Sequence, residues 1–195
     1  RLLPQGSADK ILRHIRVCHD ICHSAVMFES QADVLRQYQA LGIQVGKIQV
    51  SSAVQVDFSQ LAVGDRTAAF EQLTSFNEPR YLHQTCIREP NQSIHFHQDL
   101  SVALETVADP QSLENAWSVH FHVPIFLESL GLLSTSQHDI LECLEVCKSM
   151  PNLEHFEVET YAWNVLPEHL QQSDLAQGIA DELLWFRNLV STYRS

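Results

Sequence analysis

The stretch Arg16-Val-Cys-His-Asp20-Ile-Cys-His23-Ser-Ala-Val-Met-Phe28 decides how the rest of the chain is interpreted. Residues 16–20 predict a short strand, and Asp20 and His23 follow where that strand gives way to a loop and a helix. An Asp and a His at this spacing are suitable ligands for a divalent metal, because the carboxylate supplies a hard oxygen and the imidazole a borderline nitrogen. The pair therefore predicts one part of a metal site.

Helices and strands are expected to alternate along the chain on both sides of this stretch. The expected helices cover residues 7–14, 31–41, 57–75 (starting at Asp57 or Ser59), 99–108, 137–149 and 173–193. The expected strands cover residues 16–20, 44–51, 117–122 and 153–160, and residues 80–87 and 93–97 predict a β-hairpin. Strands that alternate with helices at crossover lengths predict βαβ units and a parallel sheet. The hairpin is an insertion, and residues 1–195 form a single α/β domain.

The four expected parallel strands separate into an apolar and a polar face, because successive strand residues point to opposite sides. The apolar face carries Val17, Ile48, Val50, Val119, Phe121, Phe156 and Val158. The polar face carries Cys18, Asp20, Lys47, Gln49, Ser51, Ser118, His120, His122, His155, Glu157 and Glu159. A closed (β/α) barrel has helices outside and a polar site at its mouth, whereas an open doubly wound sheet is apolar on both faces. The pattern favours the barrel.

The number of strands matches only part of such a barrel. A complete (β/α)8 barrel has eight strands in about 250 residues, whereas the 195 residues here contain four βα units. The chain is therefore interpreted as half of a barrel. The other units are expected from residues before Arg1, from another chain or from self-association. Unpaired strand edges aggregate, so we expect an association that covers the first and last strands.

Acidic and imidazole side chains are expected to meet at one rim of this sheet, at the carboxyl ends of the parallel strands. The potential metal ligands are Asp20, His23, His120, His122 and Glu159, with Gln49 as a sixth. The simpler interpretation has each His hydrogen-bonded locally and each acid paired with an Arg. A divalent metal is favoured over it, because buried carboxylates without compensation are costly.

The composition excludes some classes of partner. The formal net charge of −12 argues against nucleic acid or an anionic membrane surface as the main partner, and so against DNA repair. No apolar run is long enough to span a bilayer. The five cysteines and the lack of a secretory signal predict reduced thiols in a cytoplasm. Cys143 and Cys147, one helical turn apart, are interpreted as buried small hydrophobes.

Five motifs carry a resemblance to a known family that covers essentially the whole chain. They are residues 19–26 (HDICHSAV), 45–53 (VGKIQVSSA), 81–84 (YLHQ), 120–126 (HFHVPIF) and 157–163 (EVETYAW). In this order they resemble the EboE family of metabolite traffic proteins, which belongs to the xylose isomerase-like TIM barrels. Members of that family are about twice as long as this chain, which resembles their C-terminal half.

The resemblance implies roles for individual residues. Asp20 matches the metal-binding Asp of the superfamily, His23 the His three residues later, and Glu159 the Glu of the last strand. Gln49 stands where the epimerases place a metal-binding His. His120 and His122 stand where endonuclease IV has Asp-x-His.

If the complete protein is an enzyme, the superfamily implies a metal-dependent sugar isomerase or epimerase that uses Zn, Mn or Mg. Its substrate is a small polyol, sugar or related metabolite. Glu159 moves a proton at the carbon beside a carbonyl, and His23 hydrogen-bonds a substrate oxygen. Lys47 either steadies an anionic intermediate or pairs with Glu157, with equal weight.

Further residues are expected around this site. Glu157 orients Lys47 or His155, and His83 lies on the hairpin with His95 and His97. The hairpin either covers the mouth as a lid or presents surface histidines. The rival function is non-catalytic, since a barrel that only binds or transports a metabolite has the same polar mouth.

Overall fold

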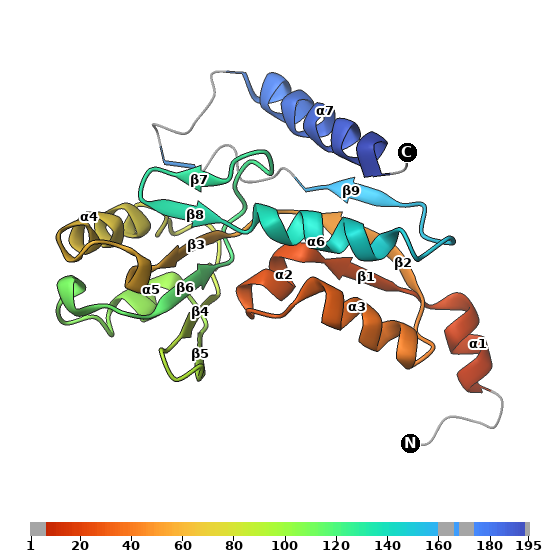
Figure 1. Ribbon diagram of the computed structural model, residues 1–195, viewed down its shortest axis with the longest axis horizontal. Helices are drawn as coiled ribbons and strands as arrows, with labels where there is room; N and C mark the ends of the chain where they lie inside the picture. Colours follow the sequence, from red (N-terminus) through yellow and green to blue (C-terminus); the bar gives the residue numbers. More distant parts are fainter. Residues whose placement is uncertain (1–6, 160–165, 168–173, 194–195) are drawn as a thin grey trace.

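The computed structural model describes residues 7–159, 166–167 and 174–193 and shows a mixed α/β protein with two sheets (Figure 1). Three parallel strands form the first sheet in the order β1-β2-β9, with bounds Val17–Asp20, Val45–Val50 and Phe156–Val158. Six antiparallel strands form the second in the order β5-β4-β6-β3-β8-β7. Their bounds are β3 Val54–Asp57, β4 Thr85–Arg88, β5 Ile94–His97, β6 Ala116–Val119, β7 Ser129–Leu130 and β8 Leu133–Thr135. The α/β class is confirmed, and the described strands do not close into a barrel.

The helices pack on these two sheets. Their bounds are α1 Ser7–His14, α2 Ile21–Val26, α3 Gln31–Ala40, α4 Val63–Thr74, α5 Leu100–Leu104, α6 Gln137–Cys147 and α7 Leu175–Tyr193, with short 3-10 turns at Phe58–Gln60 and Pro110–Ser112. Helices α3 and α6 lie side by side next to the parallel sheet, and α7 lies along β9 (Figure 1). Helices α4 and α5 belong to the half of the molecule that holds the antiparallel sheet.

A separate apolar core stabilises each sheet. Ile48 and Val50 of β2 are fully buried against Ile140 of α6 and Phe186 of α7, with Phe156 packed against them. The apolar face predicted for β2 and β9 is therefore confirmed. The other core lies between the antiparallel sheet and helices α4 and α5, around the fully buried side chains of Phe58 and Trp117. Burying a large apolar side chain contributes about 1.5–3 kcal/mol.

The expected fourth parallel strand, residues 117–122, is corrected by the structure. Strand β6 ends at Val119 and pairs antiparallel with β3 and β4. Strand β3 was not predicted from the sequence. It follows β2 after a short turn and provides β6 with an antiparallel partner. Beyond β6 the chain leaves this sheet and returns to the end of β2, where Val123 N–H donates to Ser52 O at 3.1 Å. The described sheet thus has three parallel strands, and the half barrel stays a prediction.

Other boundaries differ by local capping. The residues after Asp20, which were expected to form a loop, form helix α2. The helix expected from Asp57 or Ser59 begins at Val63, because Asp57 Oδ1 accepts the Ser59 N–H at 3.0 Å and caps a 3-10 turn instead. Helix α5 ends at Leu104 rather than at residue 108. The hairpin is confirmed as antiparallel β4 and β5, but its first strand begins at Thr85 rather than at residue 80. The expected ends at residues 160 and 173, and residues 160–163 of the last family motif, lie outside the described residues.

Candidate metal centre

Polar side chains gather where the parallel strands end, and Asp20 is the first of them. Asp20 is the last residue of β1 and the N-cap of α2, where its Oδ1 accepts the His23 N–H at 3.1 Å. The same oxygen accepts from Ser51 Oγ at 3.2 Å. Because Ser51 directly follows β2, Asp20 ties together the carboxyl ends of two strands. A carboxylate N-cap is favourable because it satisfies N–H groups that the helix leaves unpaired.

Glu159 reaches the same rim from β9. Its Oε2 accepts from Gln49 Nε2 and lies 3.6 Å from His122 Nδ1. Burial raises the pKa of the Glu159 carboxyl, the hydrogen bond from Gln49 lowers it, and the negative charge of Asp20 raises it again, so that the net change is upward. The carboxylates predicted on β1 and β9, Asp20 and Glu159, are therefore close enough for the charge of one to shift the pKa of the other.

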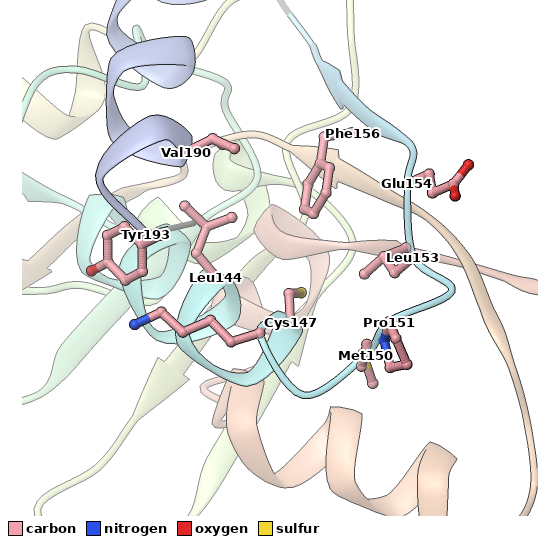
Figure 2. Close-up of a pocket in the computed structure, with 10 residues that line it drawn as sticks. Leu144, Cys147, Met150, Pro151, Leu153, Glu154, Phe156, Val190 and Tyr193 are labelled. Carbon is pink, nitrogen blue, oxygen red and sulfur yellow. The ribbon is translucent and has the colours of Figure 1, made fainter. Parts of the chain in front are cut away.

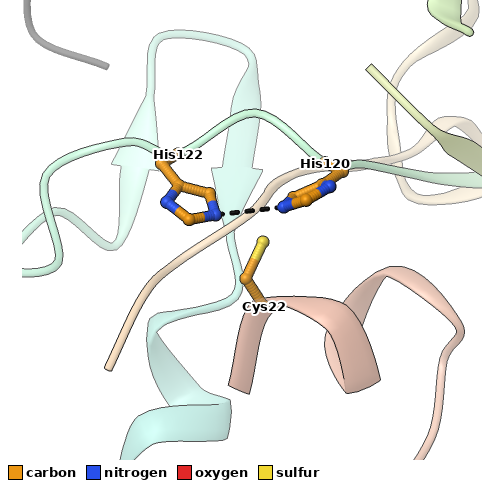
Figure 3. Close-up of side chains that lie close together, drawn as sticks. All are labelled: Cys22, His120 and His122. Atoms are coloured by element: carbon orange, nitrogen blue, oxygen red, sulfur yellow. Dashed lines mark hydrogen bonds between the residues drawn. The ribbon is translucent and has the colours of Figure 1, made fainter. Parts of the chain in front are cut away.

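Three imidazoles and a thiol complete the cluster. His120 and His122 follow β6, and their Nε2 atoms lie 3.1 Å apart (Figure 3). The ring centroid of His120 is 4.5 Å from that of His23. The sulfur of Cys22 points from α2 toward the two rings in Figure 3. The possible ligand atoms of Cys22, His120 and His122 all lie within 4.8 Å of one another, so these three residues could hold a metal ion.

Burial sets the protonation of this cluster. It lowers the pKa of His120 to about 4, helped by the positive charge of His23, and lowers the pKa of His122 to about 3, helped by that of His120. Both imidazoles are therefore neutral near pH 7, the form that coordinates metals. Burial raises the pKa of the Cys22 thiol, and the charges of Asp20 and Glu159 raise it further. A bound cation is what would deprotonate it.

All six predicted metal ligands lie in this region. His23 stands at the mouth, with its side chain 61% exposed and its Nδ1 3.8 Å from Asp20 Oδ2. The amide of Gln49 is engaged on both sides, since it accepts from Cys18 Sγ and donates to Glu159. Gln49 is thus held as a partner of Glu159.

Lys47 lies two residues before Gln49 on the same face, and so farther from the rim. Its Nζ is 2.6 Å from Glu157 Oε2, and this hydrogen bond raises the lysine pKa. Of the two alternatives for Lys47, the ion pair with Glu157 is the one present. His155 stands before β9, exposed, with its backbone carbonyl accepting from Ile48 N–H. Its position at the amino end of β9 separates it from the cluster.

His83 is buried behind His120 rather than exposed on a lid. Its Nδ1 lies 3.2 Å from the His120 carbonyl oxygen and its Nε2 lies 3.0 Å from Glu78 Oε1. Its ring also packs on Phe121, with the centroids 4.8 Å apart. His83 therefore supports the main chain that carries His120 and His122.

Cys22 and Gln84 were not predicted as parts of the site, and Ser51 was placed on the polar face without a role. Cys22 stands between Asp20 and His23, but a loop was expected there, and only the helix brings its thiol toward the imidazoles. Gln84 Oε1 lies 3.0 Å from His120 Nδ1, a contact that depends on the pairing of β4 with β6. A thiol within an Asp-x-x-His segment was the one available signal.

A separate cavity of about 480 Å³ lies at the other end of β9, between α6 and the end of α7 (Figure 2). Its wall includes Leu144, Leu153, Phe156 and Val190, with Cys147 at one side. Figure 2 shows mainly aliphatic and aromatic side chains there. All five cysteines of the chain are free, and Cys143 and Cys147 are buried, as expected. This cavity lacks the converging acids and imidazoles of the rim.

No family model, no curated protein and no solved structure matches this chain. Among the helices of the described part, none is both long and apolar enough to cross a membrane. The candidate site is therefore defined by its own geometry.

Proposed function

We propose that the chain is a metabolite-handling protein of the EboE type, built on part of a sugar isomerase or epimerase-like barrel. Its rim acts on, or binds, a small polyol, sugar or related metabolite with the help of a divalent metal. The observation that carries this proposal is the meeting of Asp20, His120, His122 and Glu159 at one rim. These residues come from three segments far apart in the sequence.

The residues of the rim suit this chemistry. A divalent metal, when bound, polarises a carbonyl and holds adjacent oxygens. Glu159, whose carboxyl has a raised pKa, is suited to exchanging a proton with the carbon beside a carbonyl. His23 is exposed at the mouth, where it can hydrogen-bond a substrate oxygen. Lys47 lies below the rim on the same face of β2, where it pairs with Glu157 and supplies positive charge.

The proposal includes a partner and a location. In the described part of the chain, β1 and β9 each pair with β2 on one side only, which leaves two strand edges for further barrel strands. These are expected from another half or from a second copy. A reducing, cytoplasmic environment fits the five free cysteines.

The alternative function is binding and transfer of a metabolite without turnover. Gln49 favours this alternative, because it stands where the epimerases have a metal-binding His and because both ends of its amide are engaged. A rim with that ligand replaced can still recognise hydroxyl groups through its acids and imidazoles.

Proton exchange separates the two functions. The purified protein is incubated in D2O with zinc or manganese and with D-fructose or D-xylulose, and NMR records both binding and deuterium at the carbon beside the carbonyl. myo-Inositol, which has no carbonyl, is added separately as a probe of polyol binding alone. An enzyme is expected to introduce deuterium, and Glu159→Gln to reduce the rate by about 100-fold or more. Glu154→Gln, at an exposed site near the other end of β9, is the matched control. Binding without deuterium exchange supports the alternative, and no binding of any of these probes counts against both.

A further inference from the structure

We infer that Cys22, His120 and His122 form a thiolate and bis-imidazole site for zinc, rather than an oxygen-rich site built on Asp20 and Glu159. The inference deepens the proposed function by naming the metal and its ligands. It rests on the proposed function only because both use the same rim. The carboxylates then serve as neighbours of the metal rather than as its principal ligands.

The spacing of the two imidazoles fits a shared ion. In tetrahedral zinc sites the metal–nitrogen distance is about 2.0–2.1 Å, which places two ligand nitrogens about 3.3 Å apart. The Nε2 atoms of His120 and His122 are 3.1 Å apart. Small movements of two side chains therefore admit an ion without any change of the fold.

Hydrogen bonds orient the rings for this role. Gln84 Oε1 can only accept, so His120 Nδ1, at 3.0 Å, carries the proton and His120 Nε2 presents its lone pair. Without a metal, that lone pair accepts a hydrogen bond from the N–H at His122 Nε2. When an ion takes the place of this proton, His122 can be protonated instead at Nδ1, which lies 3.6 Å from Glu159 Oε2. Gln84 and Glu159 are thus positioning residues for the two ligands.

Cys22 determines the class of metal. Its side chain is fully buried, near Ala53 and Cys86 in a small apolar cluster, and its N–H donates to Ser51 Oγ at 3.2 Å. Thiolate with two imidazoles selects zinc and similar ions, whereas Mg²⁺ and Mn²⁺ prefer oxygen ligands. Three protein ligands leave a fourth position for water or a bound oxygen, as in catalytic zinc sites. The Cys22 proton leaves to solvent when the ion binds.

Cobalt substitution tests the thiolate directly. Co²⁺ is added to the metal-free protein under reducing conditions, and absorption is recorded in the near ultraviolet and visible. We expect a sulfur-to-cobalt charge-transfer band, the strong visible bands of four-coordinate cobalt, and displacement by zinc but not by excess Mg²⁺. A wild-type spectrum typical of nitrogen and oxygen ligands alone, or displacement by Mg²⁺, overturns the inference.

Paired variants identify the sulfur. Cys22→Ser is expected to lose the charge-transfer band. It should also weaken zinc binding by more than about 100-fold, because loss of a residue that only supports a ligand already costs about 10–100-fold. Cys86→Ser, the same change in the same buried cluster, is expected to keep both. A band that survives in Cys22→Ser, or disappears in Cys86→Ser, overturns the assignment. Circular dichroism verifies folding, and the wild-type spectrum decides the question if a variant does not fold.

These outcomes are separable from those for the proposed function. Metal-dependent deuterium exchange in a protein whose cobalt spectrum shows no sulfur ligand leaves the proposed function intact and removes only the zinc–thiolate site. A thiolate-ligated metal in a protein that neither binds nor turns over the probes keeps the site and removes the proposed function.

Discussion

Glu78 and His83 act on the candidate site through the main chain. Glu78 accepts the backbone N–H groups of Arg80 and Tyr81, at 2.8 and 3.0 Å, and its Oε1 also lies 3.0 Å from His83 Nε2. The other ring nitrogen of His83 is beside the His120 carbonyl. One carboxylate therefore orders the turn before β4 and, through one imidazole, the segment that bears His120 and His122, the two histidines of the candidate metal centre.

This arrangement predicts a pH dependence of stability. Burial alone raises the pKa of the Glu78 carboxyl, but the hydrogen bonds from Arg80, His83 and Tyr81 outweigh it, and the folded-state pKa is lowered from 4.5. The ionised carboxylate thus contributes stability above about pH 4.5, and this contribution is lost as the pH falls through the folded-state value. Glu78→Gln should reduce the free energy of unfolding by about 1–2 kcal/mol at pH 7. The difference from wild type should shrink below pH 4.5.

Urea unfolding at a series of pH values measures this effect. Glu71→Gln, an exposed substitution on α4, is the control and should change stability little at any pH. A wild-type advantage over Glu78→Gln that stays constant from pH 7 to pH 3 would contradict the role given to the ionised carboxylate.

At the scale of elements, the register of β1 and β2 determines whether the rim forms. The strands pair in parallel with Cys18 opposite Lys47 and Asp20 opposite Gln49, after an irregularity between Val17 and Cys18. Gly46 lies beside this irregularity. A Cβ built on Gly46 would be 2.8 Å from Arg16 Cβ, so only glycine allows this approach of the two chains.

Two glycine-to-alanine substitutions test the close approach. Gly46→Ala is expected to lower stability by about 1–3 kcal/mol, as overpacking does, although alanine is otherwise better than glycine in a strand. Gly64→Ala in α4 has nothing within 4 Å of the new Cβ and should be neutral or stabilising by up to about 1 kcal/mol. Chemical denaturation compares the two. Equal or greater stability of Gly46→Ala would show that the contact does not limit the register.

The helix and strand periods in the sequence predicted much of this arrangement. Alternation correctly placed Gln49 with Glu157 and Glu159, and His120 with His122, because side-chain direction in an extended chain depends only on position. It could not predict that residues 117–119 pair antiparallel with β3, since pairing depends on partners distant in sequence. Cys22 was missed for a similar reason: its direction follows from the helix that Asp20 caps.

At the scale of the whole molecule, chemistry and packing separate along the parallel sheet. The acids, imidazoles and thiol gather at the carboxyl ends of its strands, while the opposite end of β9 adjoins the separate cavity near α6 and α7. One face of the sheet is covered by the core that contains Ile48 and Val50. The other face carries Lys47, Gln49 and Glu157, which pair with one another or with neighbours across the strands.

The edges of this sheet predict how the molecule associates. Strands β1 and β9 each have one side that no described strand covers, and exposed strand edges pair with other chains. Strand β5 is also an edge, but of the antiparallel sheet, and it serves as the internal control. We expect light scattering after size-exclusion chromatography to show association that depends on concentration.

Hydrogen exchange then locates the interface. Amides of β1 and β9 should become more protected as the concentration rises, while those of β5 should not change. The reason is that, in the proposed barrel, the further strands are added at β1 and β9, which encloses the polar face of the sheet and keeps its acids and imidazoles at the rim. A monomer at all concentrations would contradict the expected self-association. Protection gained only at β5 would mean that the molecule associates through its other sheet, and that a second copy does not complete the barrel.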